Sequence, residues 1–222
     1  MSTPNPYRLL VEGAEDKRVV PELIEKHGIV WEPRPKQYYA EIKDCGGIDK
    51  ILQESFISTH FKSSGLKALG IIVDADGLSE NHPSRIPDIL RHCKKIVPEF
   101  DWTLHASGIV ATDQSGKRLG LWVMPDNSNP GMLENLLLSL PPANQHALVE
   151  QARSATKNAK ANHAAPYSAV HEHKAVIHTW LAWQDPPGRQ LHQAIQENIL
   201  QPHSPIADAF VAWFRRLFPT EV

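Results

Sequence analysis

Two aspartates at alternate positions, Asp74 and Asp76, are the residues of this chain whose types and spacing most clearly point to chemistry. They follow the apolar run 69–73, which has the β-branched composition of a buried strand, so they should lie at its carboxyl end. Open α/β sheets build their binding sites at that end of the strands. Two carboxylates that flank one small residue repel each other unless a cation or hydrogen bonds offset their charge. A divalent metal is therefore the first explanation to test.

Other acidic residues fall where they would meet this pair. Glu12 follows the first expected strand, and Asp126 follows the last. In a parallel sheet these strand ends share one edge, so residues far apart in sequence converge there. Asp16 and Glu134 lie in the first turns of the helices that come next. They either face the same pocket or only interact favourably with a helix N-terminus.

The elements that must position these acids alternate along the chain. Apolar periodicity predicts strands at 7–11, 38–43, 67–73, 107–112 and 117–124, and helices at 15–27, 48–60, 84–95 and 131–140. This order predicts an α/β fold with a Rossmann-like core, in which helices sandwich a mainly parallel sheet. The segment 113–116 (DQSG) is a hairpin signal, so one antiparallel strand should join the sheet.

The composition changes after residue 140 and becomes richer in Ala, Gln and His. Residues 1–140 are therefore expected to form the α/β core, and residues 141–222 a helical extension packed on it. Apolar positions at helical spacing occur in the stretches 144–156, 168–183, 189–200 and 206–217.

Bulk composition sets limits on the class of protein. The chain has 222 residues, of which 41% are hydrophobic, and a formal net charge of −2, so no global basic field attracts nucleic acid, although a local patch stays possible. Cys45 and Cys93 form no CxxC motif, which fits a reducing compartment. Because we find neither a secretory leader pattern nor an apolar run of about 18 residues, we expect a cytoplasmic protein without a membrane partner.

The order of these acidic motifs resembles the Toprim signature, in which a glutamate follows the first strand and a DxD follows the third. The matching residues are 11–16 (VEGAED) and 73–76 (VDAD). The sequence pattern EGxxD is similar to the motif in Toprim domains of OLD (overcoming lysogenisation defect) nucleases and of small stand-alone bacterial proteins. Similarity to an uncharacterised Toprim-like family extends over nearly the whole chain, through 46–48, 122–127, 131–134, Lys174 and 181–184.

This resemblance implies Mg²⁺ or Mn²⁺ and phosphoryl transfer on nucleic acid. The implied metal ligands are Glu12, Asp16, Asp74, Asp76 and Glu134, with Asp16 and Glu134 matching the second metal of OLD-type nucleases. The implied catalytic residues are Glu12 and Lys174, the lysine stabilising charge in the transition state. Two hard cations about 3.5 to 4 Å apart would polarise the phosphate and activate water, and they need several carboxylates around them.

The leading hypothesis is therefore a Toprim-fold, divalent-metal-dependent phosphodiesterase that acts as a DNA or RNA nuclease. The chain contains no GxxxxGK[ST] motif, so ATP hydrolysis would have to come from a separate ATPase partner. Two alternatives stay open. One is a regulatory Toprim module that is non-catalytic or depends on such an ATPase, and the other is a small-molecule phosphohydrolase.

Two further patterns invite functional interpretations that we do not favour. His171 and His173 suggest zinc, but side chains two apart on a helix point about 200° apart. Trp180, Trp183 and Trp213 could stack on bases, yet at helical spacing among apolar neighbours we expect them in the core.

Overall fold

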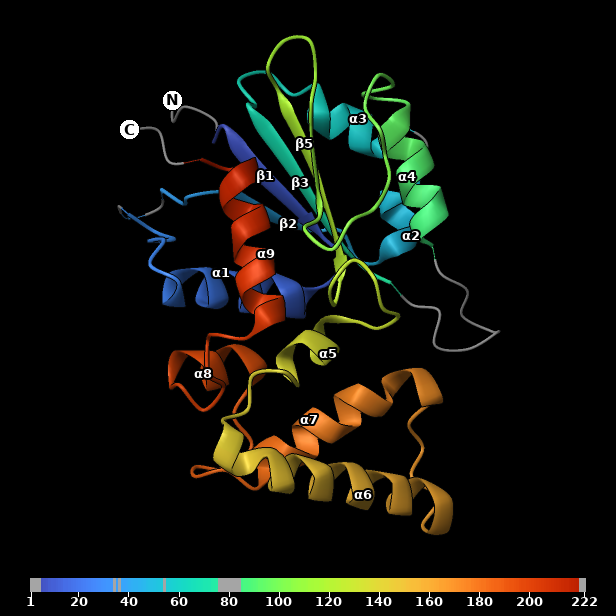
Figure 1. Ribbon diagram of the computed structural model, residues 1–222, viewed down its shortest axis with the longest axis vertical. Helices are drawn as coiled ribbons and strands as arrows, with labels where there is room; N and C mark the ends of the chain where they lie inside the picture. Colours follow the sequence, from blue (N-terminus) through green and yellow to red (C-terminus); the bar gives the residue numbers. More distant parts are fainter. Residues whose placement is uncertain (1–4, 34, 36, 54, 76–84, 220–222) are drawn as a thin grey trace.

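A five-stranded sheet with helices on both faces forms the body of the protein (Figure 1). The computed structural model describes residues 5–33, 35, 37–53, 55–75 and 85–219. The strands are β1 (Tyr7–Val11), β2 (Glu41–Asp44), β3 (Ala68–Asp74), β4 (Ile109–Thr112) and β5 (Arg118–Met124). The α-helices are α1 (Ala14–Lys26), α2 (Ile48–Ile51), α3 (Phe56–Phe61), α4 (Ile86–Lys94), α5 (Leu133–Leu137), α6 (His146–Asn162), α7 (Glu172–Ala182), α8 (Leu191–Gln196) and α9 (Pro205–Leu217). Short 3₁₀ helices, η1 (Ala143–Gln145) and η2 (Ala169–His171), precede α6 and α7.

The strand order across the sheet is β2-β1-β3-β5-β4. The first four of these neighbours run parallel, and β4 pairs antiparallel with β5. The expected α/β class is confirmed, as is the hairpin that adds one antiparallel strand. Because β1, β2 and β3 are parallel neighbours, their carboxyl ends lie at one edge of the sheet.

The central strands contribute side chains to two separate hydrophobic layers. In β1, Leu9 and Val11 belong to the layer that includes α1 and α9, whereas Leu10 belongs to the layer that includes α2, α3 and α4. Successive side chains of a strand point to opposite faces, and a parallel sheet covered on both faces needs apolar residues at both. This requirement explains the continuous apolar run of β3.

Helix α9 lies against the sheet at two glycines (Figure 1). Gly70 of β3 and Gly120 of β5 are register partners, and an added Cβ at Gly120 would come within 2.5 Å of the Leu217 side chain. An added Cβ at Gly70 would come within 2.9 Å of the same side chain. The glycines therefore leave the space into which α9 packs.

Two predicted helices are wrong in their extent. The predicted helix 131–140 is reduced to α5 (Leu133–Leu137). The stretch 48–60 forms two short helices, α2 and α3, rather than one. Ser55 interrupts them because its φ of 64° lies in the left-handed region, which does not continue a right-handed helix. The apolar positions that predicted this helix nevertheless face the core. Ile51 is buried, and Ile48, Leu52 and Phe56 are partly buried against the same hydrophobic cluster.

The tryptophans mostly occupy the core, as expected. Trp180 and Trp213 are fully buried, and the indole NH of Trp213 donates to the Ile109 carbonyl oxygen at 2.9 Å. Trp183 differs, because it follows the last residue of α7 and is 43% exposed.

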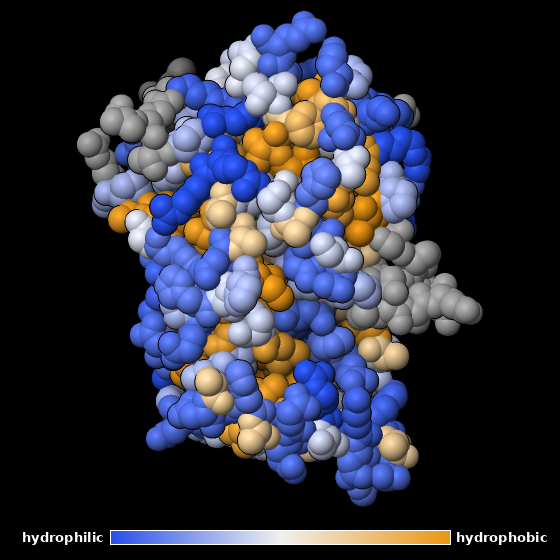
Figure 2. All heavy atoms as spheres, viewed as in Figure 1, coloured by the Kyte–Doolittle hydropathy of each residue, from blue (hydrophilic) through white to orange (hydrophobic). Residues whose placement is uncertain are grey.

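Helices α5, α6 and α7 lie beyond the carboxyl ends of the strands, with α6 and α7 side by side (Figure 1). On the face drawn in Figure 2, hydrophobic side chains form patches separated by hydrophilic ones. Within the described part of the chain, every helix is too short or too polar to span a bilayer.

Candidate functional site

Three acidic residues lie at the carboxyl tips of three adjacent strands. Glu12 directly follows β1, Asp44 ends β2, and Asp74 ends β3. In the sheet, Val11 is the register partner of both Asp44 and Ile72, so Glu12 stands between the other two tips. We call these residues, together with Asp16 and Glu134, the acidic edge.

Backbone hydrogen bonds hold the carboxylates of Glu12 and Asp74. Glu12 Oε1 accepts from the Asp74 N–H at 2.8 Å, which ties the loop after β1 to the end of β3. Asp74 Oδ1 accepts from the Leu133 N–H at 3.1 Å, which brings the first residue of α5 to the same place. Glu134, the next residue of α5, is therefore carried to this edge.

Asp44 belongs to the acidic edge although the sequence analysis did not select it. Its Oδ1 accepts from the Gly46 N–H at 2.8 Å, and the turn continues through Gly47, whose N–H donates to the Glu12 carbonyl oxygen at 2.8 Å. Both glycines have positive φ, a conformation that side chains disfavour. The signal was present in the sequence, because Asp44 follows the expected strand 38–43 just as Glu12 follows the first.

Asp16 is the most strongly perturbed acid of the edge. It lies in the first turn of α1, is 9% exposed, and its Oδ2 accepts from the Gly13 N–H at 3.1 Å. Burial raises the pKa of Asp16 to about 6, helped by the negative charges of Glu134 and Asp44, against the hydrogen bond from Gly13. These charges act on Asp16 because the fold brings the three acids near one another.

Glu134 is paired with Lys174. Lys174 Nζ lies 3.3 Å from Glu134 Oε1, and the exposed fractions of the two side chains are 45% and 5%. The pair joins α5 to α7, so a lysine 40 residues further along the chain reaches the acidic edge. On the same helix, burial lowers the pKa of His173, whereas the charges of Glu172 and Glu134 oppose this shift.

Asp126 has a different position and role. Its carboxylate accepts from the N–H groups of Ser128 and Asn129 and from the Asn129 side chain, at 2.7 to 3.0 Å. Burial alone would raise the pKa of Asp126, but these hydrogen bonds outweigh it and lower the pKa. The carboxylate thus stabilises its own turn after β5.

Asp76 lies outside the described residues. Of the other residues predicted for the site, the structure brings Glu12 to Asp74, Glu134 to Lys174, and Asp16 within the influence of Glu134. Carboxylate oxygens are the ligands that Mg²⁺ and Mn²⁺ prefer, so the donor chemistry of the acidic edge fits a hard cation.

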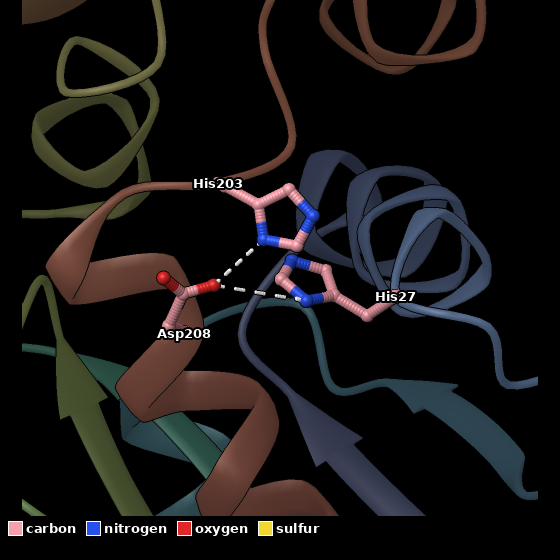
Figure 3. A group of neighbouring side chains, drawn as sticks. All are labelled: His27, His203 and Asp208. Carbon is pink, nitrogen blue, oxygen red and sulfur yellow. Dashed lines mark hydrogen bonds and ion pairs between the residues drawn. The ribbon is translucent and has the colours of Figure 1, made fainter.

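A second group of potential ligands lies between the end of α1 and the start of α9. Within the described ranges, the three-residue group whose ligand atoms all lie within 4.8 Å of one another is His27, His203 and Asp208 (Figure 3). We call it the histidine cluster. The described carboxylates of the acidic edge do not form a group as tight as this one.

A hollow between α3 and α4 is separate from both groups. Its lining residues are Ser55, Ile57, Ser58, Lys62, His92, Lys95 and Ile96. The acids of the edge do not line it, so we do not connect it with their chemistry.

Comparison with known proteins gives one match. The family described as "Protein of unknown function (DUF3226)" matches residues 6–219. Searches of curated proteins and of solved structures find no match to the chain. Since the family match spans nearly all of the sequence, the chain belongs to the DUF3226 family.

Proposed function

We propose that this chain is a divalent-metal-dependent phosphodiesterase that cleaves nucleic acid at the acidic edge. The observation that carries the proposal is the gathering of five acids at one edge of the sheet. Glu12, Asp44 and Asp74 lie at three adjacent strand tips, and Asp16 and Glu134 lie in the first turns of α1 and α5. Like charges held close together repel one another unless a cation offsets them. A divalent cation among these acids would offset the repulsion, so cation binding would explain why the fold brings them together.

The resemblance to Toprim domains supplies the assignment of ligands. Glu12, Asp74 and Asp76 would hold Mg²⁺ or Mn²⁺, and Asp76 enters this set from the sequence motif alone. Asp16 and Glu134 would hold a second ion. Glu12 and Asp74 lie close together, because the Glu12 carboxylate accepts from the Asp74 N–H at 2.8 Å, and this supports their assignment to one ion.

The chain's own groups have distinct tasks in this scheme. When bound, the metal polarises the phosphodiester and lowers the pKa of water. Lys174 places a positive charge beside the phosphate, where negative charge grows in the transition state. The 3.3 Å contact with Glu134 orients this lysine, and its 45% exposure leaves room to turn toward a substrate.

A cleavage assay tests the proposal. Purified protein is incubated with single- and double-stranded DNA and with RNA, in Mg²⁺, in Mn²⁺ and in EDTA. The test variant is Asp74→Asn, which keeps an oxygen that accepts from the Leu133 N–H. Asp101→Asn is the matched control, because this exposed aspartate lies outside the acidic edge.

Metal-dependent cleavage that Asp74→Asn abolishes and Asp101→Asn retains is the expected result. Equal cleavage by both variants contradicts the proposal. Hydrolysis of a small phosphodiester without cleavage of any polymer would point to the small-molecule phosphohydrolase. Activity that appears only after a separate ATPase is added would favour the regulatory module.

A further inference from the structure

We propose that His27, His203 and Asp208 form a zinc site that fastens the start of α9 to the end of α1 (Figure 3). His27 follows the last residue of α1, His203 lies in the loop before α9, and Asp208 lies in the first turn of α9. Imidazole nitrogen and carboxylate oxygen are regular ligands of Zn²⁺. This site is independent of the function proposed for the acidic edge.

The distances suit one small ion. Asp208 Oδ1 is 2.9 Å from His203 Nδ1 and 3.8 Å from His27 Nδ1. Metal bonds of about 2.0 to 2.1 Å at tetrahedral angles separate neighbouring ligand atoms by about 3.3 Å, which lies between these two values. His203 is 65% exposed, so its ring can adjust to a bound ion.

The hydrogen bonding of His27 leaves the correct nitrogen for a metal. His27 Nε2 lies 2.9 Å from the Pro202 carbonyl oxygen, which only accepts, so Nε2 carries the hydrogen. In the neutral ring, Nδ1 then has a lone pair on the side of Asp208 Oδ1 (Figure 3). A ligating histidine commonly donates its second N–H to a backbone carbonyl in this way.

Packing and hydrogen bonding hold His27 in place beside Asp208. Arg215 is held nearby because its guanidinium donates to the His27 carbonyl oxygen at 2.6 Å. A lone pair that faces a carboxylate oxygen is unfavourable without a proton or a cation between them.

The start of α9 holds two of the ligands in place. Ser204 caps this helix, with its hydroxyl oxygen accepting from the Ala207 N–H at 3.2 Å. His203 and Asp208 lie on either side of Ser204 in the sequence and are exposed. The side chain of His27, in contrast, is buried, with 7% of its surface exposed. Three protein ligands leave a fourth position for water, so the ion would link α1 to α9 while keeping one coordination position open.

Zinc binding to protein treated with EDTA and then freed of the chelator tests the proposal. Calorimetric titration should give one tight Zn²⁺ per chain in wild type and at least tenfold weaker binding in His203→Ala and Asp208→Asn. Both positions are exposed, so these variants should fold. His105→Ala, at another exposed histidine, should bind as wild type does.

Thermal unfolding and X-ray absorption complete the test. At a hundredfold excess over the wild-type Kd, Zn²⁺ should raise the Tm by about 5 to 10 °C in wild type and in Asp74→Asn, and by about half of that or less in His203→Ala. The absorption spectrum should show two imidazole ligands. Zinc binding that survives in both cluster variants, or that disappears in Asp74→Asn, overturns the proposal, as does a site without imidazole.

Discussion

The two candidate ion sites of this molecule are built in opposite ways. At the acidic edge, the fold gathers like charges, and each described carboxylate already accepts a backbone N–H or pairs with a lysine. At the histidine cluster, a single carboxylate faces two imidazole rings, and the three ligand atoms lie within 4.8 Å of one another. In our proposals, a cation at the first site would relieve repulsion among acids, whereas an ion at the second would replace the proton shared by His203 and Asp208.

The largest expected effect is on cleavage, and it should distinguish the Mg²⁺ site at the acidic edge from the zinc site at the histidine cluster. Asp74→Asn should lower Mg²⁺-dependent cleavage more than about 100-fold, because even the outer partners of metal ligands contribute about 10- to 100-fold. The same variant should keep the zinc-induced rise in Tm. His203→Ala should behave in the reverse manner. Cleavage rates and melting curves of the two variants, measured side by side, check this pattern.

If one variant abolished both properties, the two sites would be parts of a single metal system. The contrast drawn above between two independent sites would then be wrong. Retention of both properties in both variants would contradict both assignments.

The next largest effect should come from replacing Lys174. In the proposed scheme, this lysine would compete with a metal ion for the Glu134 carboxylate. Lys174→Met should lower the rate of cleavage at saturating metal by about 10- to 100-fold, because it removes a charge beside the transition state. Mg²⁺ should nevertheless bind more tightly, because the Glu134 side chain is only 5% exposed and, without Lys174, its buried charge would be left for the metal ion to neutralise. Cleavage rates across a Mg²⁺ titration separate these two changes.

Lys157→Met is the matched control for Lys174→Met. Lys157 lies on the neighbouring helix α6 and pairs with Glu172 at 3.9 Å. It should change neither the rate nor the metal dependence. Equal losses in the two variants would mean that Lys174 only contributes to a general positive potential.

The sequence predicted the acidic edge because its acids follow strands. Once a parallel sheet is expected, Glu12 and Asp74 must lie at neighbouring strand tips, and the structure brings them together through a hydrogen bond. Asp44 followed the same rule and was missed because no motif drew attention to it. Lys174 was matched by resemblance alone, since nothing in a solvated helix indicates which distant acid it contacts.

The histidine cluster could not be predicted in the same way. His27 and His203 are separated by most of the chain, and their meeting depends on how α9 packs across the sheet at Gly70 and Gly120. The histidine pair that the sequence did suggest, His171 and His173, does not appear in a ligand group among the described residues. Helix-end positions carry no periodic signal, so tertiary packing decides which of them meet.

A smaller effect should appear in the pH dependence of stability. In metal-free protein, the pKa of Asp16 is raised from 3.8 to about 6. Its stabilising contribution is therefore complete below about pH 4 and is lost as the pH rises through about 6. Asp16→Asn should be more stable than wild type at pH 7.5, by up to about 3 kcal/mol, and equal to it near pH 4. Urea unfolding in EDTA at the two pH values measures the difference.

Lower stability of Asp16→Asn at pH 7.5 would contradict the electrostatic penalty on which the proposed metal site depends. Wild type in Mg²⁺ provides the control. Bound Mg²⁺ should raise the stability of wild type at pH 7.5 by more than it raises that of the variant, which lacks a ligand of the second ion.

The smallest effect should come from Asp208→Asn without zinc. Asp208 and His203 are 53% and 65% exposed, so their 2.9 Å pair contributes under about 1 kcal/mol, and asparagine keeps an acceptor for the ring N–H. With zinc, the same substitution should reduce the ligand-induced rise in Tm to about half or less. A large loss of stability in EDTA would mean that the cluster is a permanent polar clamp between α1 and α9. A small loss in EDTA and a large one in zinc would identify it as a site whose contribution depends on the ion.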